Sequence, residues 1–277
     1  MGKVNTITRG GSRWYVDPRT HEKVPGVTSV VGMLPKPFLT FWAAKMTAEA
    51  AVDNLSAVQA IAATDRDGAV DFLKGSHRRY TKQRADVGSM AHDVFERIMN
   101  GERVGHVHPD IASHVRHFSE FMTLVNPELV RAEDVAWSTT HNYAGSFDAI
   151  LRVWLDANRK PTPDRSGDPH LIMVDYKTSK STYPDVALQL AAYAHADKII
   201  DPDGNEMMMP EFDGAAVLHV TESEWSFKPV DISREVFDYF LTLRKVFDWD
   251  REKSKTVLGK PLIRGGRMQT GTQRRAA

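Results

Sequence analysis

The chain has 277 residues, of which 42% are hydrophobic and 26% are charged. These values are ordinary for a soluble globular protein with one large domain, or with one domain and an attached arm. The chain contains no cysteine, which excludes disulfides, thiolate zinc sites and iron–sulfur clusters. Its 36 basic and 36 acidic residues give a formal net charge of zero, which neither supports nor excludes nucleic acid as a partner.

Neither the N-terminus nor the interior of the chain carries a segment typical of secretion or membrane insertion. The first residues, MGKVNTITRGGSRWYVDP, lack the apolar centre of a secretory signal. No stretch approaches the roughly 18 apolar residues without charge that a membrane span requires. We therefore expect a cytoplasmic protein without membrane contact, located in the host cytoplasm if the gene is phage-encoded.

The N-terminal half is expected to be mainly helical after a short β element. Residues 1–37 predict this β element, with strands at 14–16 and at 27–31, the second of which follows Pro25-Gly26. The following region, 38–126, predicts helices at 38–62, 65–84, 87–100 and 110–125, from their alanine content or from apolar residues at helical spacing. Asn100-Gly101 and Pro127 are typical helix-ending signals.

The second half alternates strands and helices. We expect strands at 133–140, 144–155, 170–177, 215–220 and 224–230, helices at 185–200 and 234–249, and a polar loop at 156–169. The predicted fold class is α/β, with a central mixed sheet flanked by helices and a helical N-terminal part. Residues 38–252 would form this domain. Residues 253–277 are basic, lack acidic residues beyond Lys253, and are expected to be disordered when unbound.

Three charged residues on two of the predicted strands form a candidate catalytic group: Asp148, Asp175 and Lys177. Two carboxylates on adjacent strands can converge at one end of a sheet, and Mg²⁺ or Mn²⁺ prefers such oxygen ligands. Lys177 is two residues from Asp175, so both side chains should lie on the same face of the strand. The alternatives are a structural ion pair between Asp175 and Lys177, and a β-bulge beside Gly145 that carries Asp148 on the surface.

His92 is a candidate nitrogen ligand on a predicted helix. His92 and Glu96 are four residues apart, so they share one helix face. A helix laid over the sheet edge could direct His92 at a metal ion held by the carboxylates. A surface or capping histidine is the alternative.

Taken together, four segments resemble the RecB-like branch of the PD-(D/E)xK nucleases, which includes Cas4-type exonucleases. These segments are Gly88–His92, Gly145–Asp148, Asp175–Lys177 and Gln189–Tyr193, in the order found in that branch. The opening VPGVTSVVGMLPKPFLTFWAAK is also similar to the N-terminal region of phage-encoded members. Cas4 proteins usually carry four cysteines for an iron–sulfur cluster, and this chain has none, so a cluster-free phage relative is the better match.

The resemblance implies a restriction-endonuclease-like fold and a set of roles. His92, Asp148, Asp175 and the Tyr176 carbonyl would bind Mg²⁺ or Mn²⁺, and Lys177 would be the catalytic lysine. Two residues of a neighbouring helix, Gln189 and Tyr193, would support the site or touch DNA, and their alternative reading is ordinary helix packing. Glu133, expected to begin the first strand of the second half, is an accessory acidic candidate.

The function expected from these features is a metal-dependent DNA exonuclease acting at duplex ends or on single strands, in phage recombination, replication or repair. The alternatives are a non-catalytic DNA-binding recombination accessory protein with the same fold, and a structure-selective endonuclease. The chain has no G-x-x-x-x-G-K-[ST] motif, so a recombination or helicase partner would have to separate strands. Relatives in the superfamily form rings, which makes a homo-oligomer a further expectation.

A basic run and a group of histidines are weaker indications of a binding site than the four segments above. Arg78, Arg79 and Lys82 lie in a basic run at 74–84, which suits a surface that follows phosphates, although a solvated helix face would look the same. A zinc site is conceivable from four nearby histidines, but a solvated loop and helix face is the favoured interpretation. These histidines are His106, His108, His114 and His117.

Overall fold

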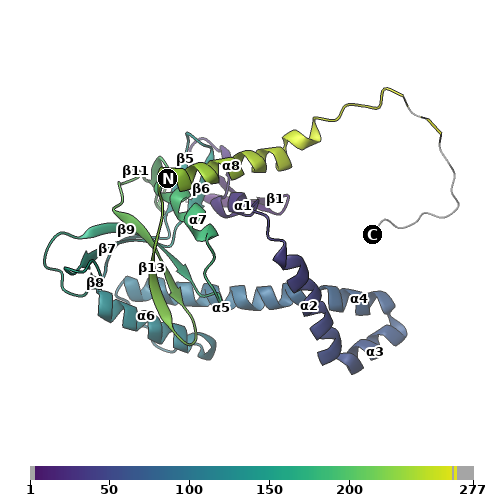
Figure 1. The fold of residues 1–277 in the computed structure, drawn as a ribbon, viewed down its shortest axis with the longest axis horizontal. Coiled ribbons are helices and arrows are strands. Elements are labelled where there is room, and N and C mark those ends of the chain that lie inside the picture. Colours follow the sequence, from purple (N-terminus) through teal and green to yellow (C-terminus); the bar gives the residue numbers. More distant parts are fainter. Residues whose placement is uncertain (1–3, 264, 267–277) are drawn as a thin grey trace.

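A mixed sheet forms the centre of the protein in this computed structural model, which describes residues 4–263 and 265–266 (Figure 1). The strands follow the order β13-β12-β9-β7-β4, and β8 pairs with β7 at its end. Only β9 and β12 pair in parallel, and the other neighbours are antiparallel. The strands are β4 (Glu128–Ala132), β7 (Ala149–Leu155), β8 (Pro161–Thr162), β9 (His170–Lys177), β12 (Gly214–Val220) and β13 (Trp225–Val230).

Helices cover both faces of this sheet, and each face has its own apolar core. Met173 of β9 and Val217 of β12 pack toward α1, α7 and α8, while Val174 and Leu218 pack toward α5 and α6. This alternation follows from the two-residue period of a strand, and it explains why β9 and β12 are apolar throughout their centres. The helices are α1 (Val27–Val31), α5 (Ser76–Met99), α6 (Ala112–Val125), α7 (Asp185–Ala194) and α8 (Arg234–Arg251).

Two smaller antiparallel sheets lie beside the central one. The first contains β1 (Asn5–Arg9), β2 (Ser12–Val16) and β3 (Lys23–Pro25). The second has the order β11-β10-β5-β6, with strands β5 (Val135–Ser138), β6 (Tyr143–Ser146), β10 (Lys198–Ile200) and β11 (Glu206–Met208). The two sheets share a third core that contains Tyr15, Trp137 and Ala144, so the N-terminal segment packs directly on the body.

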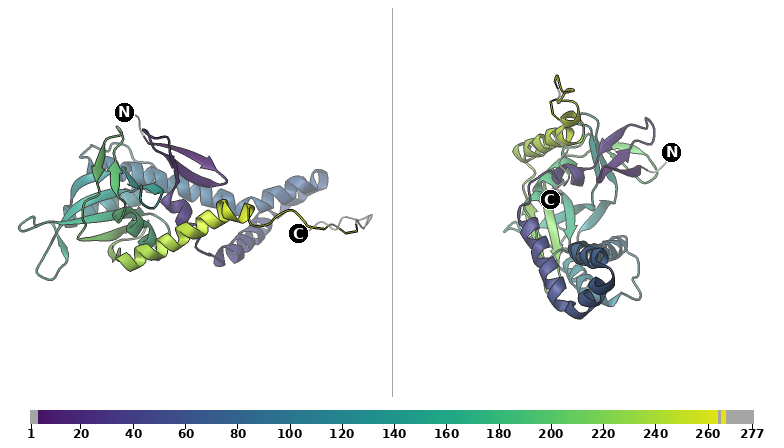
Figure 2. Two further views of the ribbon diagram at one scale, coloured as in Figure 1. Left: turned by 90° about the horizontal axis from the view of Figure 1, so that it is seen from above. Right: turned by 90° about the vertical axis from the view of Figure 1, so that its right-hand side faces the viewer.

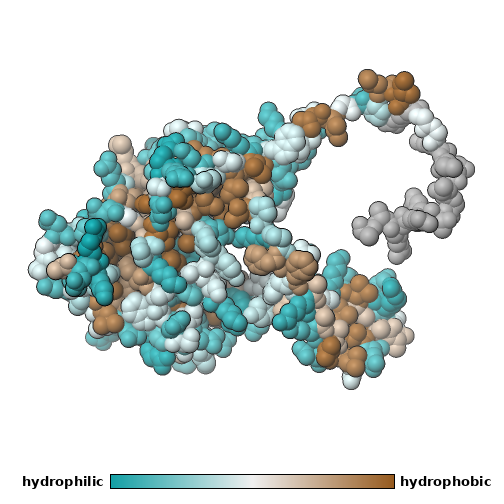
Figure 3. Space-filling view, in the orientation of Figure 1, coloured by the Kyte–Doolittle hydropathy of each residue, from teal (hydrophilic) through white to brown (hydrophobic). Residues whose placement is uncertain are grey.

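A helical arm projects from the body beside the first half of α5 (Figures 1 and 2). We use this name for residues 38–74, which form α2 (Phe38–Asp53), α3 (Leu55–Thr64) and α4 (Arg66–Lys74). Neither α2 nor α3 contains a buried residue. Phe41 is 78% exposed and Val52 is 75% exposed, and Figure 3 shows hydrophobic atoms across the arm's surface. The arm therefore gains little stability from packing on the core.

The predicted fold class is confirmed, but several element boundaries were wrong. The segment 27–31 is not a strand but helix α1, whose buried residues Val27, Val30 and Val31 follow helical spacing and contribute to the main core. The predicted helix 185–200 ends at Ala194, and residues 198–200 form strand β10 instead. Short apolar segments fit either a helix or a strand, and packing decided both cases.

Helix breaks and strand breaks also differ from the expectation. The predicted helices 65–84 and 87–100 are divided at Gly75 rather than near residue 85, so α5 is one continuous helix of 24 residues. The predicted strand 144–155 is two strands in different sheets, separated at Phe147 and Asp148. Glu133 does not begin a strand. It lies in the turn between β4 and β5 with φ +55°.

The basic segment 253–277 is described only in part. Residues Lys253–Lys255 form a short 3-10 helix after α8, and the expectation of disorder for residues 264 and 267–277 falls outside the described residues. Among the helices that the structure describes, none is long and apolar enough to cross a membrane.

Candidate active site

A cavity of about 570 Å³ lies beside α5, where strands of the central sheet meet β6 and α7. Its lining includes acidic, basic, aromatic and imidazole side chains from six separate segments of the chain. The lining residues with charged or hydrogen-bonding side chains include Arg13, His92, Glu96, Glu133, Asp148 and Gln189. Polar groups that converge in a concave site are the usual setting for catalysis or ligand binding.

Asp148 lies at the start of β7, where the chain crosses from the β5-β6 sheet to the central sheet. Its side chain is 18% exposed, and its Oδ2 accepts a 2.6 Å hydrogen bond from the backbone N–H of Tyr176 on the neighbouring strand. Burial raises the pKa of Asp148, while the Lys177 ammonium and the Tyr176 N–H act in the opposite direction. The chain crossing thus brings this carboxylate to the end of β9.

Asp175 and Lys177 occupy the same face of β9, as the strand period predicts. Asp175 Oδ2 lies 2.5 Å from Lys177 Nζ in an ion pair, and the Asp175 side chain is 3% exposed. Burial and the nearby charge of Asp148 raise the pKa of Asp175 to about 7, although Lys177 and His92 lower it. The ion pair named as the structural alternative is therefore present, but a second carboxylate, that of Asp148, lies near it and lines the cavity.

Helix α7 positions the Asp175 carboxylate from the opposite side. Gln189 Nε2 donates to Asp175 Oδ1 at 2.9 Å and also lies 3.2 Å from the Tyr193 hydroxyl. Tyr193 is 2% exposed and packs against β6, where a Cβ on Gly145 would lie 2.6 Å from its ring. Of the two roles considered for Tyr193, support of the site fits this burial, and contact with DNA does not.

His92 enters the site from α5, on the other side of the sheet. Its Nδ1 lies 3.9 Å from Asp148 Oδ1, and its ring lies edge-on to the Tyr176 ring at 5.8 Å. Burial lowers the pKa of His92, and Lys177 lowers it further, whereas Asp175 and a hydrogen bond to the Tyr176 backbone raise it. The lowered pKa favours the neutral imidazole at pH 7, which is the form that can bind a metal ion.

Glu133 and Glu96 add two more carboxylates to this cavity. The Glu133 N–H donates to the Asp148 carbonyl at 3.2 Å, which fixes the turn beside the site. Burial raises the pKa of Glu133 to about 7, and the charges of Asp148, Glu96 and Asp134 add to the effect. The accessory acidic residue predicted at position 133 is therefore close to the main carboxylates, although it comes from a turn rather than a strand.

The types of donor in this region, carboxylates and an imidazole, are ones that bind divalent cations. Within the described residues, no group of three or more His, Cys, Asp or Glu side chains is already arranged to hold a metal ion. Protein donors occupy both carboxylates instead: Tyr176 N–H at Asp148, and Gln189 with Lys177 at Asp175. The partner of Asp175 Oδ2 is the Lys177 ammonium, and a cation would further offset the repulsion between the two carboxylates.

The basic residues predicted to follow phosphates lie on the first half of α5 and divide into two groups. Arg78 and Lys82 share one helix face with Ser89 and His92. Successive positions in this series are separated by about one or two helical turns, so their side chains project from the same side of α5. No ion pair among the described residues involves either cation. Arg79 instead turns back toward α4, where its Nη2 donates to the Phe72 carbonyl at 2.8 Å.

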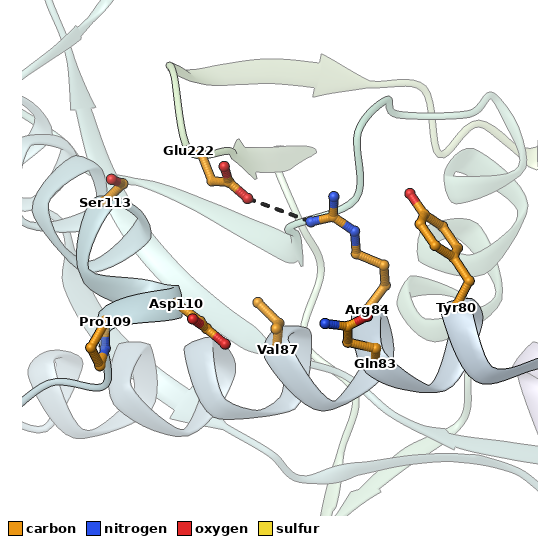
Figure 4. Close-up of a pocket in the computed structure, with 8 residues that line it drawn as sticks. All are labelled: Tyr80, Gln83, Arg84, Val87, Pro109, Asp110, Ser113 and Glu222. Carbon is orange, nitrogen blue, oxygen red and sulfur yellow. Dashed lines mark hydrogen bonds and ion pairs between the residues drawn. The ribbon is translucent and has the colours of Figure 1, made fainter. Parts of the chain in front are cut away.

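A second cavity, of about 350 Å³, lies on the opposite face of α5 (Figure 4). Figure 4 shows Tyr80 and Arg84 on α5 and Glu222 from the β12–β13 turn, with Arg84 and Glu222 paired at 3.4 Å. Arg84 also lies over the Tyr80 ring at 5.7 Å. This cavity is separated from Asp148 and Asp175 by the helix, and its arginine is already paired with Glu222.

The four histidines considered for zinc do not form a metal-binding group within the described part of the chain. His114 and His117 are buried on α6, and His106 and His108 are exposed in the preceding loop. His117 Nδ1 lies 2.9 Å from the Thr221 carbonyl, which is a structural contact between α6 and the β12–β13 turn. The favoured solvated face was therefore correct for two of these residues only.

Several cavity residues were missed as site candidates, among them Glu96 and Arg13. Glu96 was noted only for sharing a helix face with His92, and that four-residue spacing was sufficient to place it in the cavity. Arg13 comes from β2, which pairs with β1 and β3 and is packed on β6 through a 3.0 Å hydrogen bond from Ser146 N to the Tyr15 hydroxyl. No sequence signal linked this N-terminal strand to residues more than 130 positions away.

Comparisons with known proteins add little to this geometry. No protein-family model matches the chain, and no curated protein matches it. A crystal structure of SSO0001 shows 14% sequence identity and a TM-score of 0.26, over 48% of this chain. The match spans about half, 54%, of that protein. A similarity at this level carries no argument about fold or function.

Proposed function

We propose that this protein is a metal-dependent deoxyribonuclease that hydrolyses phosphodiester bonds at DNA ends or in single strands. One observation carries the proposal: Asp148, Asp175, Lys177 and His92 come from three separate segments and converge at one end of β9. A single strand pair could place an ion pair by chance. A second buried carboxylate and an imidazole from a helix on the other side of the sheet add the ligand types of a metal site to that pair.

Each residue of the candidate site would have a separate role in hydrolysis. Asp148, Asp175, His92 and the Tyr176 carbonyl would hold Mg²⁺ or Mn²⁺, and the bound ion would polarise the phosphoryl oxygen and lower the pKa of an attacking water. Gln189 keeps Asp175 in place through its 2.9 Å hydrogen bond. The Lys177 ammonium, which pairs with Asp175, would orient the water or stabilise negative charge on the phosphate.

Positive charge along α5 supports DNA as the substrate. Residues 74–84 contain Lys74, Arg78, Arg79, Lys82 and Arg84 and no acidic residue. Arg78 is 14 residues before His92, so the cationic face extends about 21 Å from the site along the helix axis. A charged surface of this length next to the carboxylates suits a phosphate backbone that enters the cavity from the side of the arm.

Digestion of end-labelled linear DNA and closed circular DNA, with Mg²⁺ or Mn²⁺ and with EDTA, tests this function. An exonuclease should release labelled nucleotides from linear DNA and leave circles intact, and EDTA should stop the reaction. Cleavage of the circle would identify an endonuclease. Binding of DNA without hydrolysis under any of these conditions would contradict the proposal and identify a non-catalytic accessory protein.

A further inference from the structure

Four aromatic side chains form a row that starts beside the candidate site and continues onto the helical arm. The row consists of Tyr183, Phe38, Trp42 and Tyr80. Tyr183 and Phe38 are stacked, with ring centroids 6.2 Å apart and an interplanar angle of 15°. Trp42 is one turn after Phe38 on α2, and its ring lies 6.0 Å from that of Tyr80 on α5.

Three of the four rings are exposed and Trp42 is half-buried, although large aromatic side chains are usually buried. Tyr183 is 53% exposed, Phe38 is 50% exposed and Tyr80 is 40% exposed. Exposing stacked rings to water forgoes a considerable hydrophobic stabilisation. The conformation of the pair is nevertheless fixed by its surroundings, because the Lys36 ammonium binds Asp185 at 2.7 Å and so joins the start of α2 to the start of α7.

The row is continuous with the site. Strand β9 ends at Lys177, and Tyr183 lies in the segment that connects it to α7. This segment touches α5 at the cavity, since a Cβ on Gly88 would lie 3.1 Å from Thr178 Oγ1. Beyond Trp42 the row reaches Tyr80, which stands within the basic run of α5 and beneath the Arg84 guanidinium. The row therefore leads from the segment after β9 to the Arg84 guanidinium in the basic run of α5.

We propose that the aromatic row binds the unpaired bases of a single DNA strand while the α5 cations bind its phosphates, so that the substrate reaches the site as a single strand. This inference rests on the proposed nuclease function and specifies its substrate. Every base has a face that can stack on an aromatic ring, so such a row holds single strands without sequence preference, and paired bases in a duplex are not available to it. The cations next to the row favour a nucleic acid over an apolar protein partner.

Binding measured in EDTA separates base stacking from phosphate contacts. The probes are a short fluorescent oligothymidylate and an oligonucleotide of equal length that contains abasic sites, which has the same phosphates but no bases. The wild-type protein should bind oligothymidylate at least about tenfold more tightly. The double variant Phe38→Ala/Tyr183→Ala should lose most of this difference and bind the abasic strand as the wild type does.

Two control variants make the result specific. Tyr239→Ala removes a 61% exposed aromatic ring from α8, outside the row, and should bind both probes like the wild type. Tyr183→Phe keeps the ring and should keep the preference for bases. Equal binding of both probes by the wild type, no binding of either, or an equal loss of both in the double variant would overturn the inference. So would a double variant that changes only the oligomeric state of the protein.

The binding assay and the cleavage assay fail independently. Suppose that the wild type binds bases, loses this binding in the double variant, and yet cleaves no DNA in Mg²⁺ or Mn²⁺. That result would refute the nuclease function and support single-strand binding by the aromatic row. If the protein cleaves DNA but binds both probes equally, the nuclease function would stand and the proposal that the aromatic row binds bases would be refuted.

Discussion

Buried carboxylates around Asp148 set the chemical character of this protein at the residue scale. Burial raises the pKa of Asp148, and it raises the pKa of Asp175 and of Glu133 to about 7. Each of these groups is less easily ionised than a carboxyl in water, which costs folding free energy at neutral pH. Lys177 offsets only part of this cost, and a bound divalent cation would offset more. Such a grouping is expected of a ligand site and is unfavourable as a structural element.

Asp134 allows the electrostatic cost of a buried carboxylate to be measured away from the proposed metal ligands. Its side chain is 4% exposed, and burial raises its pKa from the usual 3.8 to about 6, against the opposing effect of Arg131 at 3.7 Å. Folding therefore favours the protonated form. The contribution of Asp134 to stability is greatest below pH 3.8 and declines as the pH rises from about 4 to about 6.

The variant Asp134→Asn should remove this pH dependence. We expect it to be more stable than the wild type by about 1–2 kcal/mol near pH 8, and to differ little from it near pH 4. Urea unfolding of both proteins at the two pH values measures the difference. If Asp134→Asn is instead less stable than the wild type near pH 8, the ion pair with Arg131 contributes more to stability than the burial of Asp134 costs.

At the scale of elements, the close approach of α7 to β6 holds the site together. Helix α7 carries Gln189 and Tyr193, and it can reach the sheet only because position 145 lacks a side chain. A Cβ there would lie 2.6 Å from the Tyr193 ring and 3.1 Å from Val27 of α1. The packing of three elements, α1, α7 and β6, thus depends on this glycine. Glycine is needed here because there is no space for a side chain, and its backbone adopts no conformation that requires glycine.

Gly145→Ala should therefore displace α7 and with it the Gln189–Asp175 hydrogen bond. We expect a loss of about 1–3 kcal/mol in unfolding free energy, as for other overpacked positions, together with reduced DNA cleavage. Gly214→Ala is the matched control, because Gly214 also lies in a strand and an added Cβ would meet nothing within 4 Å. Thermal and urea unfolding of the two variants should differ clearly, and equal stability would mean that α7 does not pack as described.

Strands and helices with a clear period were predictable from the sequence, and contacts between distant segments were not. Strand β9 was predicted with its observed bounds, and β12 and α8 were predicted to within two residues, because each has a continuous apolar centre or a strong amphipathic pattern. The change from one sheet to the other at Asp148 was missed, since the eight apolar residues in 144–155 indicate a strand regardless of which sheet each half joins. Helix α1 was mistaken for a strand because β-branched residues favour strands.

The candidate site was predicted to a similar degree. The strand period gave the shared face of Asp175 and Lys177, and helix spacing placed His92 and Glu96 together. The stacking of Phe38 on Tyr183 required the fold, because it joins residues 145 positions apart.

At the scale of the whole molecule, a compact body with the candidate site is joined to an arm that lacks a core of its own (Figure 1). The cationic face of α5 spans both parts, since Arg78 and Lys82 lie beside the arm and His92 lies in the body. A DNA strand in contact with both the body and the arm would bind over a longer surface than either part provides alone. The salt dependence of binding reports the number of phosphates that this face contacts.

Arg78→Ala and Lys82→Ala should each lower the slope of log K against log salt concentration by about 0.7 for single-stranded DNA. The double variant should lower it by about twice that amount. Lys245→Ala removes an exposed lysine from α8, on the opposite side of the sheet, and should leave the slope unchanged. Unchanged slopes in the α5 variants would place the DNA elsewhere on the protein.

The central claim, that the end of β9 is a nuclease site, is tested most directly by Lys177→Met. This substitution removes the ammonium and keeps most of the side-chain volume. It also leaves the buried Asp175 carboxylate without its ion pair, so the variant should unfold at a lower temperature than the wild type and still be folded at the temperature of the assay, which circular dichroism checks. We predict that the rate of release of end label from linear DNA in Mg²⁺ or Mn²⁺ falls at least about 100-fold. A folded Lys177→Met protein that digests DNA at the wild-type rate would contradict the account.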